Sequence, residues 1–345
     1  MRNRYIDVLR ATAIVRVIVY HTLGFWWLTV VFPAMGLMFA LGGALMAASI
    51  DRSGAAAVGR RLRRILVPVW VLATIALVSM SFVGGMQHTW RWVLWVIPFG
   101  DAPTTVWGGT WLAMFWYIRS YLWFVVLSPV LLWVYRKWPI PSLIVPFAVL
   151  VAMVVTNSPF ATGGTLRDFF YYAPAWMLGF AYHDGQLQRL SRKVLWSIVA
   201  VLAGFGLTWL FTHPGPRIYD LNDNPLADAT WSTAFLLVLL AYAPRMLSLG
   251  RADVAVEGMN RRALTIYLWH QAAIAFVDFG AALLGISLLG RWGGFLELSS
   301  VFIVVGLLVL LFGWVEDVAA RRKPVLVPVP VEKLAVEREP QPATA

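Results

Sequence analysis

Arg10 and His21 are the residues of this sequence whose types and spacing most clearly suggest chemistry. Both lie in an otherwise apolar stretch that begins at Arg4. Ionisable side chains inside a bilayer are costly unless they face a bundle interior or a water-filled cavity, so each is a candidate functional residue. Eleven residues turn an α-helix by about three turns and 20°, which places Arg10 and His21 on one face, about 16 Å apart.

These two residues have both a chemical and a structural interpretation. Histidine suits a general base because its ordinary pKa is near neutrality, but a buried His21 could instead be satisfied by a backbone carbonyl or by Tyr20. Arg10 could bind phosphate near the membrane surface, or it could be a snorkelling anchor paired with Asp7, its i,i+3 neighbour. Arg16 points away from this face by the same helical geometry.

Arg61 and Arg64 are the next candidates, within a basic stretch that starts at Arg60. Guanidinium groups form forked hydrogen bonds that suit ligands with several phosphates. However, any cytoplasmic loop of a membrane protein collects arginines. The pair therefore indicates either a phosphate-binding site or a cytoplasmic loop whose arginines only set the orientation of the protein in the membrane.

Asp7 and four more residues could line a cavity inside the bundle. Arg119 lies in an apolar stretch close to Trp116 and Tyr117, and His270 lies in a later one. Arg119 could face the cavity, snorkel or form a structural ion pair. A satisfied core position is an equally good interpretation of His270.

Composition places the chain among membrane proteins. Of its 345 residues, 60% are hydrophobic and 13% are charged, whereas soluble domains carry about 25% charged residues. The absence of cysteine excludes thiolate nucleophiles, Cys-ligated zinc and disulfides. His88, His183 and His213 have no partners at metal-ligand spacing, so we expect no metal.

Hydropathy predicts an all-α integral membrane protein with about ten transmembrane helices. The apolar stretches lie near residues 10–30, 32–50, 65–83, 111–135, 139–156, 168–183, 194–212, 230–247, 263–284 and 295–315.

The distribution of positive charge gives the orientation. With ten spans, 21 of the 28 Lys and Arg fall on the side that holds both termini, which the positive-inside rule makes cytoplasmic. The net charge of +11 then reflects topology, and we expect no nucleic-acid partner. We expect a transmembrane domain over residues 1–315. A disordered, Pro-rich cytoplasmic tail should follow over residues 316–345, because this composition cannot build a core.

Several motifs resemble the acyltransferase-3 family of integral membrane acyltransferases. The hallmark is an arginine followed by ten residues and a histidine, here Arg10 and His21. Further similar stretches are Met38–Met46, Arg60–Trp70, Phe115–Tyr117, Leu127–Pro129, Met177–Phe180 and Thr265–Gln271. The chain is similar to the O-acetyltransferase type, as a transmembrane core without the appended extracytoplasmic domain of some members.

The resemblance implies transfer of an acyl group, usually acetyl, from cytoplasmic acyl-CoA to a hydroxyl group. The acceptor would be an extracytoplasmic or membrane-embedded carbohydrate or lipid, such as a lipid-linked glycan, and the protein would lie among lipids in the cell membrane. His21 would be the base, with Arg10, Arg61 and Arg64 near the donor. Acyl-CoA would be a co-substrate, and no cofactor would be bound permanently.

Two other classes remain open from the sequence. A transporter or flippase could line its path with intramembrane Arg and His, but we find no internal repeat or paired broken helices. A non-catalytic membrane scaffold would not explain the Arg10–His21 spacing.

Overall fold

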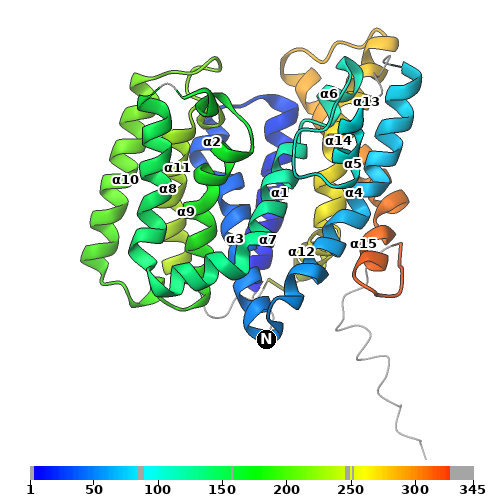
Figure 1. Ribbon diagram of the computed structural model, residues 1–345. Helices are drawn as coiled ribbons and strands as arrows, with labels where there is room; N and C mark the ends of the chain where they lie inside the picture. Colours follow the sequence, from blue (N-terminus) through cyan, green and yellow to red (C-terminus); the bar gives the residue numbers. More distant parts are fainter. Residues whose placement is uncertain (1–3, 84–88, 157, 245–248, 251, 327–345) are drawn as a thin grey trace, which may run out of the picture.

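The protein is a bundle of α-helices (Figure 1). The computed structural model describes residues 4–83, 89–156, 158–244, 249–250 and 252–326. No strand occurs among these residues, so the all-α class predicted from the sequence is confirmed.

Ten of the described helices have 17 or more residues. They are α1 (Arg4–Leu23), α3 (Ala34–Ser53), α4 (Ala56–Val83), α7 (Phe115–Lys137), α8 (Pro139–Val155), α9 (Thr165–His183), α10 (Arg192–Thr212), α11 (Pro225–Ala241), α13 (Ala263–Leu283) and α14 (Gly290–Phe312). The shorter helices are α2 (Trp27–Val31), α5 (Val93–Val96), α6 (Val106–Trp111), α12 (Ala252–Arg261) and α15 (Trp314–Ala319), with 3-10 turns η1 (Trp90–Trp92), η2 (Pro159–Thr162), η3 (Leu187–Arg189) and η4 (Leu221–Asp223).

Each long helix overlaps one of the ten apolar stretches of the sequence, although the first stretch, 10–30, extends past the end of α1 into α2. Six segments in the described part of the chain are long and apolar enough to cross a membrane, namely Trp27–Ser53, Ala56–Val83, Phe115–Lys137, Arg192–Thr212, Ala263–Leu283 and Gly290–Phe312. Helices α8 and α11 are apolar but shorter, and α1 carries Asp7, Arg10 and Arg16. The chain is therefore a multi-pass helical membrane protein, and the count of ten crossings stays a prediction.

Local sequence explains where several helices begin. Ser191 accepts a hydrogen bond from the Val194 N–H at 3.3 Å and caps α10. Asn224 caps α11 in the same way, and Pro225 at the first helical position needs no N–H partner.

Helix α1 occupies the middle of the bundle. It contacts α3 on one side and α12, α13 and α14 on the other. In Figure 1, α8 to α11 lie on the left, α1, α3 and α7 lie in the centre, and α4, α13 and α14 lie on the right. The candidate residues of α1 can therefore meet groups from both halves of the chain.

Small residues allow α3 and α9 to approach closely. A Cβ atom on Gly179 would stand 2.1 Å from the Ala40 carbonyl oxygen, and one on Gly43 would stand 2.2 Å from the Trp176 carbonyl oxygen. Both contacts are with backbone, which cannot move aside as a side chain can. Close crossings of this kind, made possible by glycine, are typical of membrane helix pairs.

Helix α15 begins just before the tail that the sequence predicts as disordered. It packs against α4, and Val315 and Ala319 are buried. Residues 316–319 thus belong to a helix, and turns, bends and irregular backbone follow to residue 326. Apolar and acidic side chains of α15 find partners that a composition analysis does not consider. Residues 327–345 of the predicted tail lie outside the described part of the chain.

Candidate functional site

A cavity of about 630 Å³ lies between α1, α3, α4, α7, α12, α13 and α15. We call it the arginine pocket, because Arg10, Arg61, Arg64, Arg261 and Arg322 line it. It lies toward the side of the bundle at which α1 begins, called the Arg4 side below, where α12 and α15 are also found (Figure 1).

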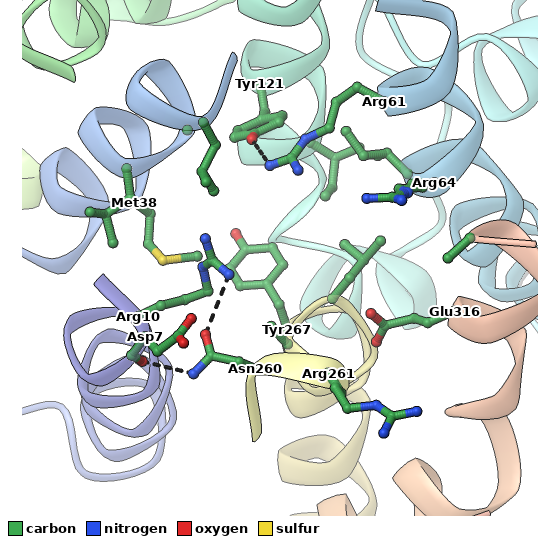
Figure 2. A pocket seen from close by; sticks show the side chains of 18 of the residues that line it. Asp7, Arg10, Met38, Arg61, Arg64, Tyr121, Asn260, Arg261, Tyr267 and Glu316 are labelled. Carbon is green, nitrogen blue, oxygen red and sulfur yellow. Dashed lines mark hydrogen bonds between the residues drawn. The ribbon is translucent and has the colours of Figure 1, made fainter. Parts of the chain in front are cut away.

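Guanidinium groups of two helices face this space. Figure 2 shows Arg10 of α1 on one side, and Arg61 and Arg64 of α4 on the other. Arg10 donates to Asn260 Oδ1 at 3.4 Å, and the Asn260 amide donates to the Asp7 backbone carbonyl at 2.7 Å. Asn260, in α12, thus ties the start of α1 to the second half of the chain.

Arg61 is held by an aromatic residue rather than by a carboxylate. It donates to the Tyr121 hydroxyl, and its guanidinium carbon lies 5.5 Å from the centre of the Tyr121 ring. Its Nε–H is buried without a hydrogen-bond partner among the described residues. A neutral partner leaves the charge of Arg61 available to a ligand anion.

The charges that line the pocket favour anions. Five arginines face three carboxylates, those of Asp7, Glu257 and Glu316. This excess of positive charge attracts anions to the pocket. The pocket is therefore suited to a ligand with more than one negative charge.

The segment after α14 forms one wall of the arginine pocket. Glu316 Oε1 accepts hydrogen bonds from the backbone N–H and the hydroxyl of Thr265, both at 2.7 Å. Asp317 is fully buried and pairs with Arg262 at 2.8 Å, while Arg262 also donates to the Val325 carbonyl. This buried pair fixes α15 against the start of α13.

His21 lies outside the lining of the arginine pocket, farther along α1. Its side chain is exposed, and its ring centre lies 5.3 Å from that of His270 in α13. The His270 ring lies 5.4 Å from the Tyr267 ring, and Tyr267 lines the arginine pocket. A row of aromatic rings therefore leads from the pocket to His21.

A polar network surrounds the end of α1 next to His21. The Tyr20 hydroxyl donates to Asp220, and Arg217 donates to the Tyr20 hydroxyl. Arg217, in the loop between α10 and α11, also binds Asp223, and these hydrogen bonds raise the pKa of Arg217 above its usual value. The network fixes this loop beside His21.

Arg16 and Arg119 have structural partners. Arg16 donates to the Leu28 carbonyl at 3.2 Å and packs over the Tyr20 ring, away from Arg10 as helical geometry predicts. Arg119 is buried and forms ion pairs with Asp168, at 2.6 Å, and with Asp101. The structure thus places Arg119 in one of the three alternatives that the sequence left open, a structural ion pair.

The aromatic neighbours of Arg119 differ in position. Tyr117 lines the arginine pocket, whereas Trp116 stacks on Tyr172 with ring centres 5.6 Å apart. His270 also lies outside the pocket lining, in the buried layer behind His21.

One group of possible metal ligands occurs in the described residues, at Asp51, His183 and Asp184. Arg136 binds both carboxylates, Asp51 at 2.8 Å and Asp184 at 2.7 Å, and His183 lies 2.8 Å from Asp51. The arrangement is a complete ion-pair network, which sequence spacing could not reveal. His88 lies outside the described residues, and His213 stacks on Trp209.

A family model described as an acyltransferase domain, acyltransferase 3, matches residues 3–315. The chain belongs to the acyltransferase-3 family. Membership extends over nearly the whole chain and makes the protein a membrane acyltransferase. No curated protein and no solved structure matches the chain.

Within this acyltransferase-3 protein, sequence reasoning missed several residues that line the pocket. Asn260, Glu316 and Arg322 come from α12 and from the segment after α14, far along the chain from Arg10. The sequence offered only a weak indication of these residues. Polar residues stand directly before the apolar stretch that begins at residue 263, and acidic residues stand directly after the apolar stretch that ends at residue 315.

We expect the Asp317→Ala protein to unfold at a lower temperature than the parent. Because Asp317 holds α15 in the wall of the arginine pocket, the variant should also bind anions in this pocket less tightly. Removing one partner of a buried ion pair costs about 3–5 kcal/mol, because the other charge is left buried and unpaired. Thermal unfolding in detergent, followed by tryptophan fluorescence, measures the first effect.

The matched control for this variant is Asp253→Ala, which removes a partly exposed partner of Arg4. Exposed pairs contribute about 0–1 kcal/mol, so its unfolding temperature should stay close to that of the parent protein. Equal unfolding temperatures for the two variants would contradict a structural role of Asp317.

Proposed function

We propose that this acyltransferase moves an acyl group of acetyl size from acyl-CoA to a hydroxyl group of a carbohydrate or lipid acceptor. CoA binds in the arginine pocket, and His21 is the general base. The observation that supports the proposal is that α1 contributes both Arg10, which lines the arginine pocket, and His21, an exposed imidazole about 16 Å farther along the helix.

The pocket has properties that suit a CoA donor. Its volume of about 630 Å³ is within the range of about 300–1,000 Å³ that is usual for small-molecule sites. CoA carries several phosphates, and Arg10, Arg61 and Arg64 offer the forked donors that such groups bind. Tyr117 and Tyr267 give the pocket an aromatic wall toward α13.

The distance from Arg10 to His21 fits a long, thin donor. With the phosphates among the arginines, the pantetheine arm would extend along the Tyr267 and His270 side of α1 and bring the thioester to His21. The exposed side of His21 then receives the acceptor hydroxyl. His21 takes the hydroxyl proton as the oxygen attacks the thioester carbonyl, the carbon–sulfur bond breaks, and the proton passes to the CoA thiolate.

The proposal is tested with purified protein and radiolabelled acetyl-CoA. We expect release of free CoA together with transfer of the label to a hydroxyl-bearing acceptor, supplied as a mixture of membrane lipids and glycolipids. Movement of a lipid or glycan across the membrane without CoA release would support a transporter or flippase instead.

Replacing Arg61 and Arg64 together by alanine should weaken CoA binding at least about tenfold, because charge-assisted hydrogen bonds to phosphates are lost. The effect should shrink at about 1 M salt, where charges are screened within about 3 Å. Calorimetric titration with CoA at low and high salt measures both effects.

Arg63 supplies the matched control, because it belongs to the same turn of α4 and lies outside the pocket lining. The Arg63→Ala protein should bind CoA as the parent does. Equal CoA affinity of the parent and the double variant at both salt concentrations would show that Arg61 and Arg64 do not bind CoA and only contribute to the positive charge of the cytoplasmic side.

A further inference from the structure

The two ring nitrogens of His270 have different surroundings. The side chain is 1% exposed, and Nδ1 lies 2.6 Å from the backbone carbonyl oxygen of Tyr267. A carbonyl oxygen only accepts hydrogen bonds, so Nδ1 must carry the hydrogen. In the neutral ring Nε2 then has a lone pair, and this atom is buried without a hydrogen-bond partner among the described residues.

A buried acceptor without a partner needs an explanation. The great majority of buried polar side-chain atoms in folded proteins are hydrogen-bonded, and exceptions concentrate where a ligand or a catalytic step completes the bonding. A histidine that served only to fill space beside α1 would leave this penalty uncompensated. A hydrogen-bond donor among the neighbours of His270 could pair with Nε2 and remove this penalty.

His21 is a titratable neighbour of the His270 ring. Its ring centre lies 5.3 Å from that of His270, and the two ring planes are tilted by 43°. Hydrogen bonds between catalytic groups are often long in ligand-free enzymes and shorten when substrate binds. With the ring centres this close, a rotation of the exposed His21 side chain would be enough to bring one of its nitrogens toward His270.

His21 lies near positive charges, so a neutral hydrogen-bond acceptor beside it would help to stabilise its protonated form. Arg16 of α1 and Arg217 of the loop between α10 and α11 are the cations that act on His21, and both oppose a positive charge on its ring. A general base becomes positively charged when it takes a proton. A lone pair directed at the other ring nitrogen stabilises that charge.

We propose that His270 is a positioning residue for His21. The Nε2 lone pair of His270 accepts a hydrogen bond from one N–H of His21, which leaves the other His21 nitrogen free to take the acceptor's proton. The catalytic part of this inference rests on the proposed function, whereas the pairing of the two rings does not. His270 holds His21 in one tautomer and exchanges no proton, as the orienting member of a catalytic triad does.

The pairing is tested by ¹⁵N NMR of the full-length, ¹⁵N-histidine-labelled protein in lipid nanodiscs. The chain has five histidines, so single substitutions assign the ring signals. We expect His270 to be protonated on Nδ1 and bare on Nε2. His270→Gln should shift the ring signals of His21, and the control His183→Gln should leave them unchanged. A hydrogen on Nε2 of His270, or His21 signals that are the same with and without His270, would overturn the proposal.

Kinetics test the catalytic part. His270→Leu should lower kcat about 100-fold, with KM for acyl-CoA changed by less than about threefold, because His270 lies outside the arginine pocket. His270→Gln supplies an amide oxygen as acceptor and should recover about tenfold of this loss. An unchanged kcat in His270→Leu would overturn the positioning role, as would equal losses in both variants.

The two measurements separate the two proposals. If the parent protein transfers no acyl group to any acceptor, the proposed function fails, and the NMR result still decides whether His21 and His270 are paired.

Discussion

Replacing His21 by alanine is expected to lower the rate of acyl transfer by about 10²–10⁴-fold, the usual contribution of a general base. The variant should fold normally, because His21 is exposed and its removal leaves no charged group buried without a partner. Binding of CoA should also be preserved, since no histidine is among the described residues that line the arginine pocket.

The measurement is a radiolabel transfer assay on purified parent and variant, at saturating acetyl-CoA. His183→Ala is the matched control, because His183 pairs with Asp51 far from His21 and should be replaceable without loss of rate. A His21→Ala protein that modifies its acceptor at nearly the parent rate would remove His21 from the mechanism.

Much of the helical architecture follows from the sequence by simple physics. An apolar stretch marks each of the ten long helices, and six segments in the described part of the chain are long and apolar enough to cross a bilayer. Such stretches form helices because a chain in lipid must satisfy its backbone hydrogen bonds internally. Helical periodicity also separates Arg10 from Arg16. Arg10 lines the arginine pocket, whereas Arg16 turns to the Leu28 carbonyl.

The sequence could not predict contacts between distant segments. His21 and His270 are neighbours only because α1 packs against α13, and periodicity within one helix contains no information about its partner. The same reason hides Asn260, which binds Arg10 from 250 positions away. Even the resemblance to a family identifies residue types without giving these distances.

Composition was also a poor guide to the segment after α14. Prolines and charges there suggest disorder, but Asp317 is fully buried against Arg262 and Glu316 binds Thr265. A single well-placed carboxylate can order a segment when the partner is a buried guanidinium, whatever the average composition of the segment. The wall of the arginine pocket therefore depends on residues that an analysis of spans discards.

The relative positions of the arginine pocket and His21 predict a reaction that proceeds across the bilayer. Arg10 lies on the Arg4 side, and a rise of about 1.5 Å per residue places His21 about halfway through a 30 Å hydrocarbon core. With the Arg4 side facing the cytoplasm, as the distribution of arginines predicts, the donor enters from one side and the acceptor from the other.

Sealed vesicles of known orientation test this arrangement, with orientation read from the accessibility of a tag placed after Ala345. Acyl-CoA supplied only on the tag-exposing side should modify an acceptor enclosed on the other side, and acyl-CoA supplied only opposite the tag should give no product. Permeabilised vesicles are the control, since acyl-CoA added on either side should then support transfer, and vesicles with the His21→Ala protein set the background.

Turnover only when donor and acceptor share the tag-exposing side would contradict transfer across the bilayer and leave the acyltransferase activity itself intact. That outcome would also require the acceptor to reach His21 through the arginine pocket, so CoA and acceptor would compete for binding around Arg10, Arg61 and Arg64.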